Sequence, residues 1–526
     1  MGNFTRREFT QGGLAVAGSL AAPRIALGQR FAGKVIKTTG NITVFDPVIS
    51  TNQATWQHAL MVYDTLFGVD LQQVPRPQMV GRYGQSDDKL TWTFELRDGL
   101  RFHDGTEVTT ADVIPSIRRW GARADWGPLL MEQVKDISAK DKRTFTIQLK
   151  ERNGLILDAL GRLCFIMRKK EAETDPGQKI DAIVGSGPFR FNAIETKLGA
   201  QYVYDRNPDY VPRKEAPSGL AGGKVVNVDR VVYVNIPDAQ TALAALQAGE
   251  IDFHSDPPID VLDQLTQDKN LKLQVLNSPG SIGWIQFNCV QPPFDNVKCR
   301  QAMLHVVNQI DYLKASFGHP KYYKTCASYF GCDVPMENDA NTPWFKNAPD
   351  YATAKQLLKE GGYDGHPVVI LQSSEWYVTK NSAEILAQQM RGAGINVEMV
   401  AVDWAGLEQR RSSKAPAHQG GWNLFVTASS AADYGSPAAS YYKADGTWYG
   451  WPTDTKHEEL RGEWLRAETL EERKRIARDL QANAWTFVPH VNFGQWVQPT
   501  VMRANINNAL PGPFQWFRVW WNIEKA

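Results

Sequence analysis

The sequence predicts an α/β protein built from two or more lobes. Its 526 residues exceed the roughly 250–300 residues at which a single hydrophobic core stops growing. From about Val35 onward, short β-branched runs alternate with capped helical segments, which is the pattern of α/β folds. The extended stretch FNCVQPP at 287–293 interrupts this alternation, and we interpret it as the crossing from one large lobe to the other.

Residues 230–253 illustrate the alternation of strand and helix. The β-branched run 230–236 predicts a strand. Asp238 is placed to cap the helix that follows, and Gly249 suits the left-handed position at the end of that helix. The next strand is then expected to begin at 251–253.

Further helices are predicted in the second half of the chain. The segment FDNVKCRQAMLHVVNQIDYL has apolar residues at helical spacing, with Asp295 as its expected N-cap, and YATAKQLLKEGGYDG is expected to end at its glycine pair. Thr469 and Glu472 form a capping-box pattern before a long helix that reaches Trp485. The apolar C-terminal run GPFQWFRVWWNI is expected to return as a strand to the first lobe. Two chain crossings would make a two-lobed clamp with a hinge.

The first 28 residues read as an export signal rather than as part of the fold. A basic segment, TRREFT, precedes an uncharged run at 12–22 and a small-residue cleavage site. The uncharged run is about eleven residues long, whereas a membrane-spanning helix needs roughly twenty. The arginine pair indicates the twin-arginine route. No cysteine follows the run, so we expect an exported, periplasmic protein that is not lipid-anchored.

Charge and cysteine content narrow the function classes. The net charge is +1, so no global field favours nucleic acid or an anionic membrane. The five cysteines fit no metal-binding spacing, and no cofactor is expected. Cys326 and Cys332 lie six residues apart in a loop, which makes them a candidate disulfide in an oxidising compartment, although the spacing leaves a reduced pair open.

The segment LTWTFELRDGLRFHDGTEVTTADV concentrates a histidine and several acids, so it raises the question of a metal site or an acid–base pair. TWTFEL alternates as a strand does. Asp98 and Asp104 each precede a glycine in a turn dipeptide, and Asp112 completes a capping box with Thr109. His103 has no second ligand on its face. The segment is therefore interpreted as scaffold.

The same segment resembles the signature of the family 5 (peptide/nickel-type) extracellular solute-binding proteins of ABC transporters. Other pieces match in order: GSGPFRF, ALQAGEIDF, FNCVQPPFDNVKCRQAMLHVVN, AKQLLKEGGYDG and ADY. The resemblance covers about 35–520. It implies a large type II periplasmic-binding-protein fold, with two hinge-linked α/β lobes around a ligand cleft and an extra subdomain.

We expect the following division of the chain: 1–28 export signal; 33–60, 187–282 and 496–526 lobe I core; 61–186 extra subdomain of lobe I; 283–495 lobe II. The implied role is that of a monomer that captures a small organic solute and delivers it to the membrane subunits of an ABC permease and their ATPases. Peptide-like or amino-bearing solutes are expected first. Opines, oligosaccharides, aromatic compounds and metal chelates remain alternatives.

Known enzyme motifs are incomplete or absent in this sequence. No G-x-S-x-G is present, and the stretch that begins His457-Glu458 has Arg461 where a metalloprotease would need its second histidine. No cysteine cluster or dinucleotide fingerprint occurs either. An extracytoplasmic hydrolase assembled from distant residues, or a sensor that uses the same cleft, stays open as an alternative.

The resemblance also implies ligand-binding residues. In peptide-binding members an acidic residue in the stretch that matches SSAADY holds the free amine of the ligand, and the matching residue here is Asp433. A buried carboxylate needs a cation or several N–H donors. Asp433 could instead cap a loop. The arginine that some members place shortly upstream to hold a carboxylate is absent from NLFVTASS.

Aromatic side chains are the remaining candidates, because flat rings stack on cations, sugars and other rings. For the tryptophans, packing in the core is the alternative. The expected ligand contacts are Trp284, Trp422, Tyr434, Trp56 and Trp376.

Overall fold

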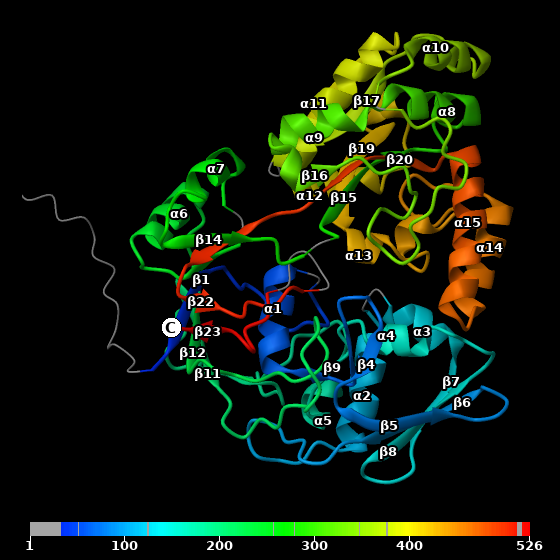
Figure 1. The fold of residues 1–526 in the computed structure, drawn as a ribbon. Coiled ribbons are helices and arrows are strands. Elements are labelled where there is room, and N and C mark those ends of the chain that lie inside the picture. Colours follow the sequence, from blue (N-terminus) through cyan, green and yellow to red (C-terminus); the bar gives the residue numbers. More distant parts are fainter. Residues whose placement is uncertain are drawn as a thin grey trace, which may run out of the picture. The chain divides into compact units, whose positions relative to one another are not determined.

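The computed structural model describes residues 33–526, apart from 51, 124–125, 256, 278, 347, 375–376 and 513–517. The expected export signal at 1–28 lies outside this part of the chain. Residues 34–526 form one compact unit. Two large sheets and one smaller sheet organise it (Figure 1).

The first large sheet has seven strands and draws on both ends of the chain. β1 runs parallel to β12, with Val35 opposite Arg230, whereas β21 runs antiparallel to β13 and β14. The strand order is β10 (Phe189–Phe191), β11 (Gln201–Arg206), β12 (Arg230–Val234), β1 (Val35–Thr39), β13 (Phe253–His254), β21 (Thr500–Arg503) and β14 (Leu271–Gln274). Helices α1 (Gln53–Val62), α6 (Ala239–Gln247) and α7 (Leu262–Leu265) accompany it.

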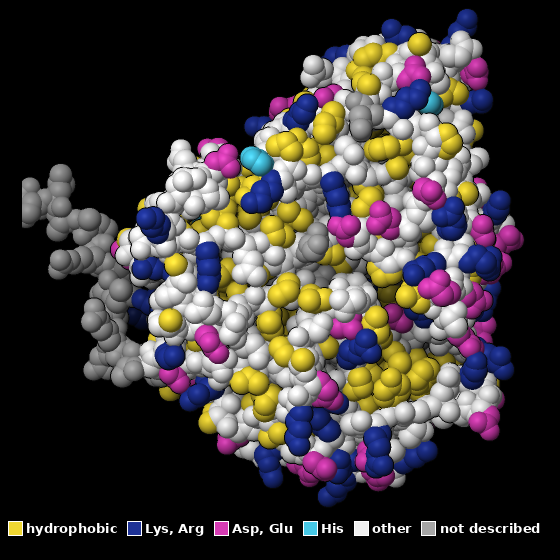
Figure 2. Space-filling model, in the orientation of Figure 1, with side chains coloured by type: hydrophobic (Ala, Val, Ile, Leu, Met, Phe, Trp, Pro, Cys, Tyr) yellow, Lys and Arg dark blue, Asp and Glu magenta, His cyan; other side chains and the backbone are white. Residues whose placement is uncertain are grey.

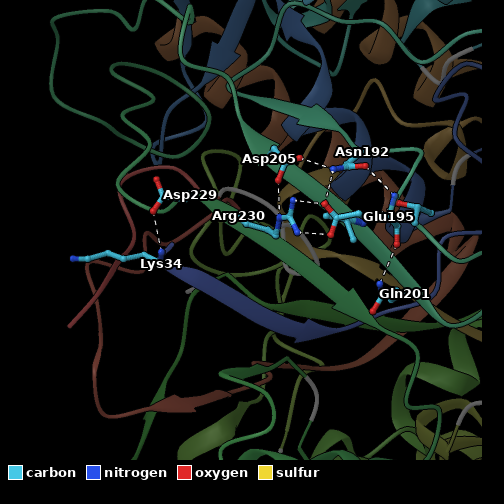
Figure 3. A network of polar contacts seen from close by, with 9 residues as sticks. Lys34, Asn192, Glu195, Gln201, Asp205, Asp229 and Arg230 are labelled. Atoms are coloured by element: carbon cyan, nitrogen blue, oxygen red, sulfur yellow. Dashed lines mark hydrogen bonds and ion pairs between the residues drawn. The ribbon is translucent and has the colours of Figure 1, made fainter. Parts of the chain in front are cut away.

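A polar network fixes the outer strands of this sheet (Figure 3). The Arg230 guanidinium on β12 binds Asp205 Oδ1 on β11 at 2.6 Å and the Glu195 carboxylate at 2.7 and 2.8 Å. Asn192 donates to the second oxygen of Asp205 at 2.7 Å. Next to it, the Lys34 backbone N–H donates to Asp229. These bonds tie β11 and β12 to the turn after β10.

The second large sheet has six strands. β15 lies in the middle and is buried along its whole length, because β20 and β19 flank it on either side. The strand order is β16 (Tyr323–Lys324), β20 (His490–Trp496), β15 (Ser281–Phe287), β19 (Leu424–Ser430), β17 (Val368–Ser373) and β18 (Val397–Val402).

Helices pack on the six-stranded sheet and on one another, and the aliphatic and aromatic residues between these elements form a large core cluster (Figure 1). These helices are α8 (Val297–Val306), α9 (Gln309–Phe317), α10 (Tyr351–Glu360), α11 (Tyr377–Gly392), α12 (Trp404–Arg411), α13 (Ala431–Tyr434), α14 (Thr455–Arg466) and α15 (Leu470–Phe487). Short 3-10 turns are η1 (Ile259–Val261), η2 (Pro320–Tyr322), η3 (Ala417–Gln419) and η4 (Ser440–Tyr442).

The smaller sheet has four antiparallel strands and its own hydrophobic core beneath α2 (Thr110–Gly121). Its strand order is β5 (Val80–Gln85), β6 (Thr91–Leu96), β8 (Thr144–Leu149) and β7 (Val134–Ala139). Figure 2 shows hydrophobic side chains gathered between α4 and β5 on the viewed face. The other elements of the chain are β2 (Asp64–Thr65), β3 (Phe67–Val69), β4 (Pro75–Pro77), α3 (Gly127–Gln133), α4 (Ile156–Leu160), β9 (Phe165–Ile166), α5 (Lys169–Ala172), β22 (Ile506–Asn507) and β23 (Glu524–Lys525).

The acid-rich segment around His103 has the scaffold geometry that the sequence predicts. The capping box is confirmed, since Asp112 Oδ2 accepts from the Thr109 backbone N–H at 2.9 Å. His103 lies between backbone groups: its Nε2 is 3.0 Å from Gly187 O, and its Nδ1 accepts from the Gly185 N–H at 3.4 Å. Burial lowers the pKa of His103 to about 4. The ring therefore ties the segment to the turn before β10.

The helix starts are largely as predicted. The Asp238 carboxylate accepts from Thr241 N, and the Thr469 hydroxyl accepts from Glu472 N. One predicted cap is wrong by one residue: Asn296, not Asp295, caps α8, with its side-chain oxygen 2.8 Å from Lys298 N. Asn and Asp are nearly equivalent N-caps, so two adjacent ones leave the helix start open in the sequence.

Both predicted crossings between the large sheets need correction. The chain leaves the seven-stranded sheet after β14 and has entered the other by Ser281, so FNCVQPP lies at the end of β15 and after it. The returning strand is β21, at Thr500–Arg503. In the C-terminal run that was expected to be this strand, residues 518–523 form no strand, although Trp520 and Trp521 are buried. Large apolar side chains there fill the core without joining the ladder.

Among the residues that the structure describes, no helix is long and apolar enough to cross a membrane. Within the same ranges, no group of three or more His, Cys, Asp or Glu side chains is placed to hold a metal ion.

Buried histidines predict acid-sensitive folding. Burial lowers the pKa of His58 and His490 to about 3 and that of His103 and His457 to about 4. In the unfolded chain these rings take up protons from about pH 6.5 downward. Below about pH 6.5 the unfolded state therefore binds more protons than the folded state. As the pH drops from 6.5 to 4, the free energy of unfolding should fall by up to about 1.4 kcal/mol per pH unit for each histidine.

Urea denaturation at pH 7.5, 6.5, 5.5 and 4.5 checks this prediction. The His58→Gln variant should show a shallower decline, because it removes one titrating ring. Equal stability at all four pH values would contradict the prediction.

Candidate functional site

The carboxylate of Asp433 sits on a single helical turn directly after β19. Ser430 ends that strand and Ala431 N donates to Gly280 O at 2.8 Å, which anchors the turn beside the start of β15. Asp433 Oδ1 lies 2.9 Å from Arg162 Nη1. The Asp433 side chain is 39% exposed, and that of Arg162 is 11% exposed. The candidate site therefore contains a carboxylate that is open to solvent on one side and paired with a cation on the other.

Arg162 reaches Asp433 from a different part of the fold. It follows α4, in the part of the chain that holds the four-stranded sheet, and its guanidinium carbon lies 5.1 Å from the centre of the Trp126 ring. A cation over an aromatic face gains electrostatic stabilisation, most of all over tryptophan. The ring thus helps to hold the guanidinium near Asp433.

Aromatic rings line the strand side of this turn. The ring centre of Trp284, on β15, lies 5.0 Å from that of Tyr434 and 5.3 Å from that of Tyr441, and the two tyrosines stack at 5.1 Å. Trp284 is 3% exposed, and its Nε1 is buried without a hydrogen-bond acceptor in the described part of the chain. An unpaired buried N–H costs free energy. A group that accepted its hydrogen bond would lower that cost.

The Tyr434 side chain supports the turn that carries Asp433 and is closed to solvent. Its side chain is fully buried, and its hydroxyl lies 2.6 Å from Asn492 Oδ1 and 2.7 Å from His490 Nε2 on β20. These bonds anchor α13 to the sheet. The expected contact of Tyr434 with a ligand stays a prediction that this burial disfavours.

Trp422 lies at the far end of β19 from Asp433. It is fully buried, its Nε1 donates to Arg411 O at 3.1 Å, and its ring packs against Phe425 and Trp451. The expected ligand contact of Trp422 stays a prediction that this burial and packing disfavour. β19 is seven residues long, and at about 3.3 Å per residue it separates the two ends by roughly 20 Å.

Two predicted ligand contacts remain, Trp56 and Trp376. Trp56, on α1, is half-buried and packs against the core of the seven-stranded sheet. Trp376 lies outside the described residues. Sequence reasoning missed Arg162, Trp126 and Tyr441. Nothing local marks Arg162, because its partner is 271 residues away.

Cys326 and Cys332 form a disulfide. The Cys332 backbone N–H also donates to the Gln495 side chain on β20, so the bridge closes a loop that is held against the six-stranded sheet. The other three cysteines are free thiols, and burial raises the pKa of Cys289 and Cys299 to about 11. Thiols with such a raised pKa are weakly nucleophilic at neutral pH.

The stretch that begins like a metalloprotease motif is also structural. His457 is buried, with its Nε2 3.0 Å from Tyr442 O, and burial lowers its pKa to about 4. Arg461 donates to Pro437 O and forms an ion pair with Glu458. These groups hold α14 against the loop after α13.

Comparison with known proteins identifies the family. The model of the bacterial extracellular solute-binding proteins, family 5, matches residues 74–450. The chain belongs to this family. A relative in Sinorhizobium fredii (strain NBRC 101917 / NGR234), named probable peptide ABC transporter periplasmic-binding protein y4tO, is 45% identical over 99% of both chains. The glutathione-binding protein GsiB of Escherichia coli (strain K12) is 27% identical to this family 5 protein over 76% of both chains.

Solved structures support the same fold. The dipeptide-binding protein of Pseudoalteromonas sp. SM9913, in complex with Met-Leu, superposes with a TM-score of 0.76 at 20% identity and covers 94% of this family 5 protein and 100% of its own chain. The predicted fold class is confirmed: this is the two-lobed α/β fold of type II periplasmic binding proteins. The predicted membership of family 5 is confirmed as well.

Proposed function

We propose that this family 5 protein is the substrate-binding component of an ABC importer and captures a small solute that carries a free amino group. The observation that carries the proposal is the partly exposed Asp433 carboxylate, which already holds a cationic group of the protein, Arg162, at 2.9 Å. An ammonium has the same charge as that guanidinium. A carboxylate offers about four acceptor positions, so a ligand ammonium can bind beside Arg162 or replace it.

The relatives support the same class of solute. One is named as part of a peptide transporter and another as a glutathione-binding protein. Both names indicate ligands with a free amine and a carboxylate. The Trp284 indole N–H, next to the turn that carries Asp433, is a hydrogen-bond donor for an oxygen of such a ligand.

The chain path supports a hinge between the lobes. The two connections between the large sheets lie next to each other, because β15 pairs with β20 and β14 pairs with β21. We propose that they form the hinge between lobe I (33–60, 187–282 and 496–526, with the subdomain 61–186) and lobe II (283–495). Ligand then favours the closed form by its extra contacts there.

The remaining parts of the proposal concern the cellular setting. We propose a monomer that is exported by the twin-arginine route, stays in the periplasm without a lipid anchor, and passes its ligand unchanged to the permease and its ATPases. It performs no covalent chemistry.

Matched pairs of ligands test the proposal. Isothermal titration of the purified protein with Met-Leu, glutathione and their N-acetyl derivatives should show binding of at least one free amine and at least tenfold weaker binding of its acetylated partner. Mass spectrometry after overnight incubation should recover the ligand intact. Equal affinity for free and acetylated forms would contradict the role of an amine, and loss of the ligand would contradict a transport role.

A further inference from the structure

A small cavity lies between the part of the chain with the four-stranded sheet and helix α14. Its volume is about 180 Å³. One wall comes from α3, the 151–155 loop and Ala159 of α4, and the opposite wall comes from α14. The lining consists of Gly462, the apolar side chains of Trp126, Leu129, Leu130, Leu155, Ala159 and Leu465, and the polar or charged side chains of Gln133, Glu151, Arg152, Asn153 and Arg466. Aromatic and aliphatic side chains therefore make up about half of the lining, and most of the remainder is polar or charged.

The cavity adjoins the candidate site through one ring. Trp126 lines the cavity, and the same indole carries the guanidinium of Arg162 at 5.1 Å. Arg162 in turn holds Asp433. The Asp433 carboxylate is thus linked to the cavity lining through Arg162 and Trp126.

The walls are held apart by fixed contacts. The guanidinium of Arg473, on α15, bonds to Gly154 O, to Ala467 O at 3.2 Å and to Asp158 Oδ2 at 3.2 Å. The backbones of Gly154 and Ala467 are in close contact there, so that a Cβ on Gly154 would lie only 2.2 Å from Ala467 O. These contacts set the spacing between the 151–155 loop and α14. The walls of the cavity are therefore held in place by the fold.

We propose that this cavity is the side-chain subsite of the ligand site and accepts a phenyl or branched aliphatic group on the ligand residue that carries the free amine. The inference rests on the proposed function. The size is suitable, because an apolar cavity of about 150 Å³ holds one benzene molecule. Full burial of such a side chain corresponds to about a 10- to 100-fold gain in affinity. Dipeptides with a bulky first residue are therefore the favoured class.

Titration with three dipeptides tests the subsite. The unmodified protein should bind Phe-Ala at least tenfold more tightly than Ala-Ala, and Ala-Phe should resemble Ala-Ala. Equal affinity for all three would overturn the subsite while leaving the proposed function intact. If none of the three binds and the ligand panel above also fails, the proposed function falls together with the subsite.

A cavity-filling variant gives the second arm. Gly462 lines the cavity, and the nearest atom to a Cβ there is the flexible end of Arg466 at 3.3 Å, so Gly462→Leu is compatible with the helix. This variant should lose at least tenfold in affinity for Phe-Ala and keep its affinity for Ala-Ala within twofold. Glu463→Leu, at the exposed neighbouring position on α14, is the matched control and should change neither value.

The outcomes of this arm are distinct. Wild-type affinity of Gly462→Leu for Phe-Ala would overturn the proposal. An equal loss for both dipeptides would also overturn it, because only a general disturbance acts on both. Leu465→Ala enlarges the same cavity and should improve binding of Trp-Ala relative to Phe-Ala, which tests the subsite even if Gly462→Leu does not fold.

Discussion

Replacement of Asp433 by asparagine is expected to weaken binding of amino-bearing ligands by about 10- to 100-fold. The two side chains have the same shape, so the change removes the negative charge and leaves the turn after β19 in place. A hydrogen bond to a charged group contributes about 1.5–3 kcal/mol, and each 1.4 kcal/mol is tenfold in affinity. Isothermal titration with the dipeptide that binds best measures the effect.

Asp445→Asn is the matched control for this prediction. Asp445 is an exposed carboxylate in a nearby loop of the same lobe, where it accepts from Thr447 N at 2.9 Å. Its replacement should leave the affinity within twofold. Unchanged affinity of Asp433→Asn would remove Asp433 from the ligand site. An N-acetylated dipeptide should bind both variants equally.

The second large effect concerns stability: Arg119→Met should lower the free energy of unfolding by about 3–5 kcal/mol. Arg119, on α2, donates to both oxygens of Asp46 at 3.0 and 2.8 Å and to Thr174 O at 3.0 Å. Both side chains of the ion pair are at most 2% exposed. Loss of the guanidinium leaves a buried carboxylate without its cation, which is strongly destabilising.

Urea denaturation followed by circular dichroism measures this loss. Arg82→Met is the control, because the ion pair of Arg82 with Glu95 is open to water, with Arg82 82% exposed, and such pairs contribute about 0–1 kcal/mol. The double variant Asp46→Asn, Arg119→Met should regain part of the lost stability. A loss below about 1 kcal/mol for Arg119→Met would contradict the prediction.

Short-range features of the fold were predictable because they depend on interactions between residues that are close in sequence. The capping box of Thr109 and Asp112 and the cap at Asp238 each involve residues within three positions of one another. Turn glycines such as Gly99, with a φ of 80°, are equally local. The family resemblance extended these pieces to the whole chain, which is why the two-lobed fold was predictable as well.

The site was predictable only in part, because its pieces meet through tertiary packing. Asp433 was found through the resemblance, whereas Arg162 is supplied by another part of the fold and has no sequence signal. Trp284 and Trp422 both lie at or next to strands of the same sheet. Whether such a ring packs in the core or faces the site depends on which elements cover each face of the sheet.

The crossing between the sheets was misplaced for a similar reason. The strand SIGWIQF is buried on both faces, so it lacks the alternation that marks a half-buried strand. The proline pair of FNCVQPP, by contrast, is a clear break in the pattern. The break comes at the end of the strand, after the chain has already crossed.

The position of β21 has a consequence for biosynthesis. This strand lies between β13 and β14, yet nearly half the chain separates it from them in sequence. Until β21 has been translated, β13 and β14 therefore lack the strand that pairs with both of them. Open strand edges invite pairing with other chains. The seven-stranded sheet is therefore completed only after every strand of the six-stranded sheet has been synthesised.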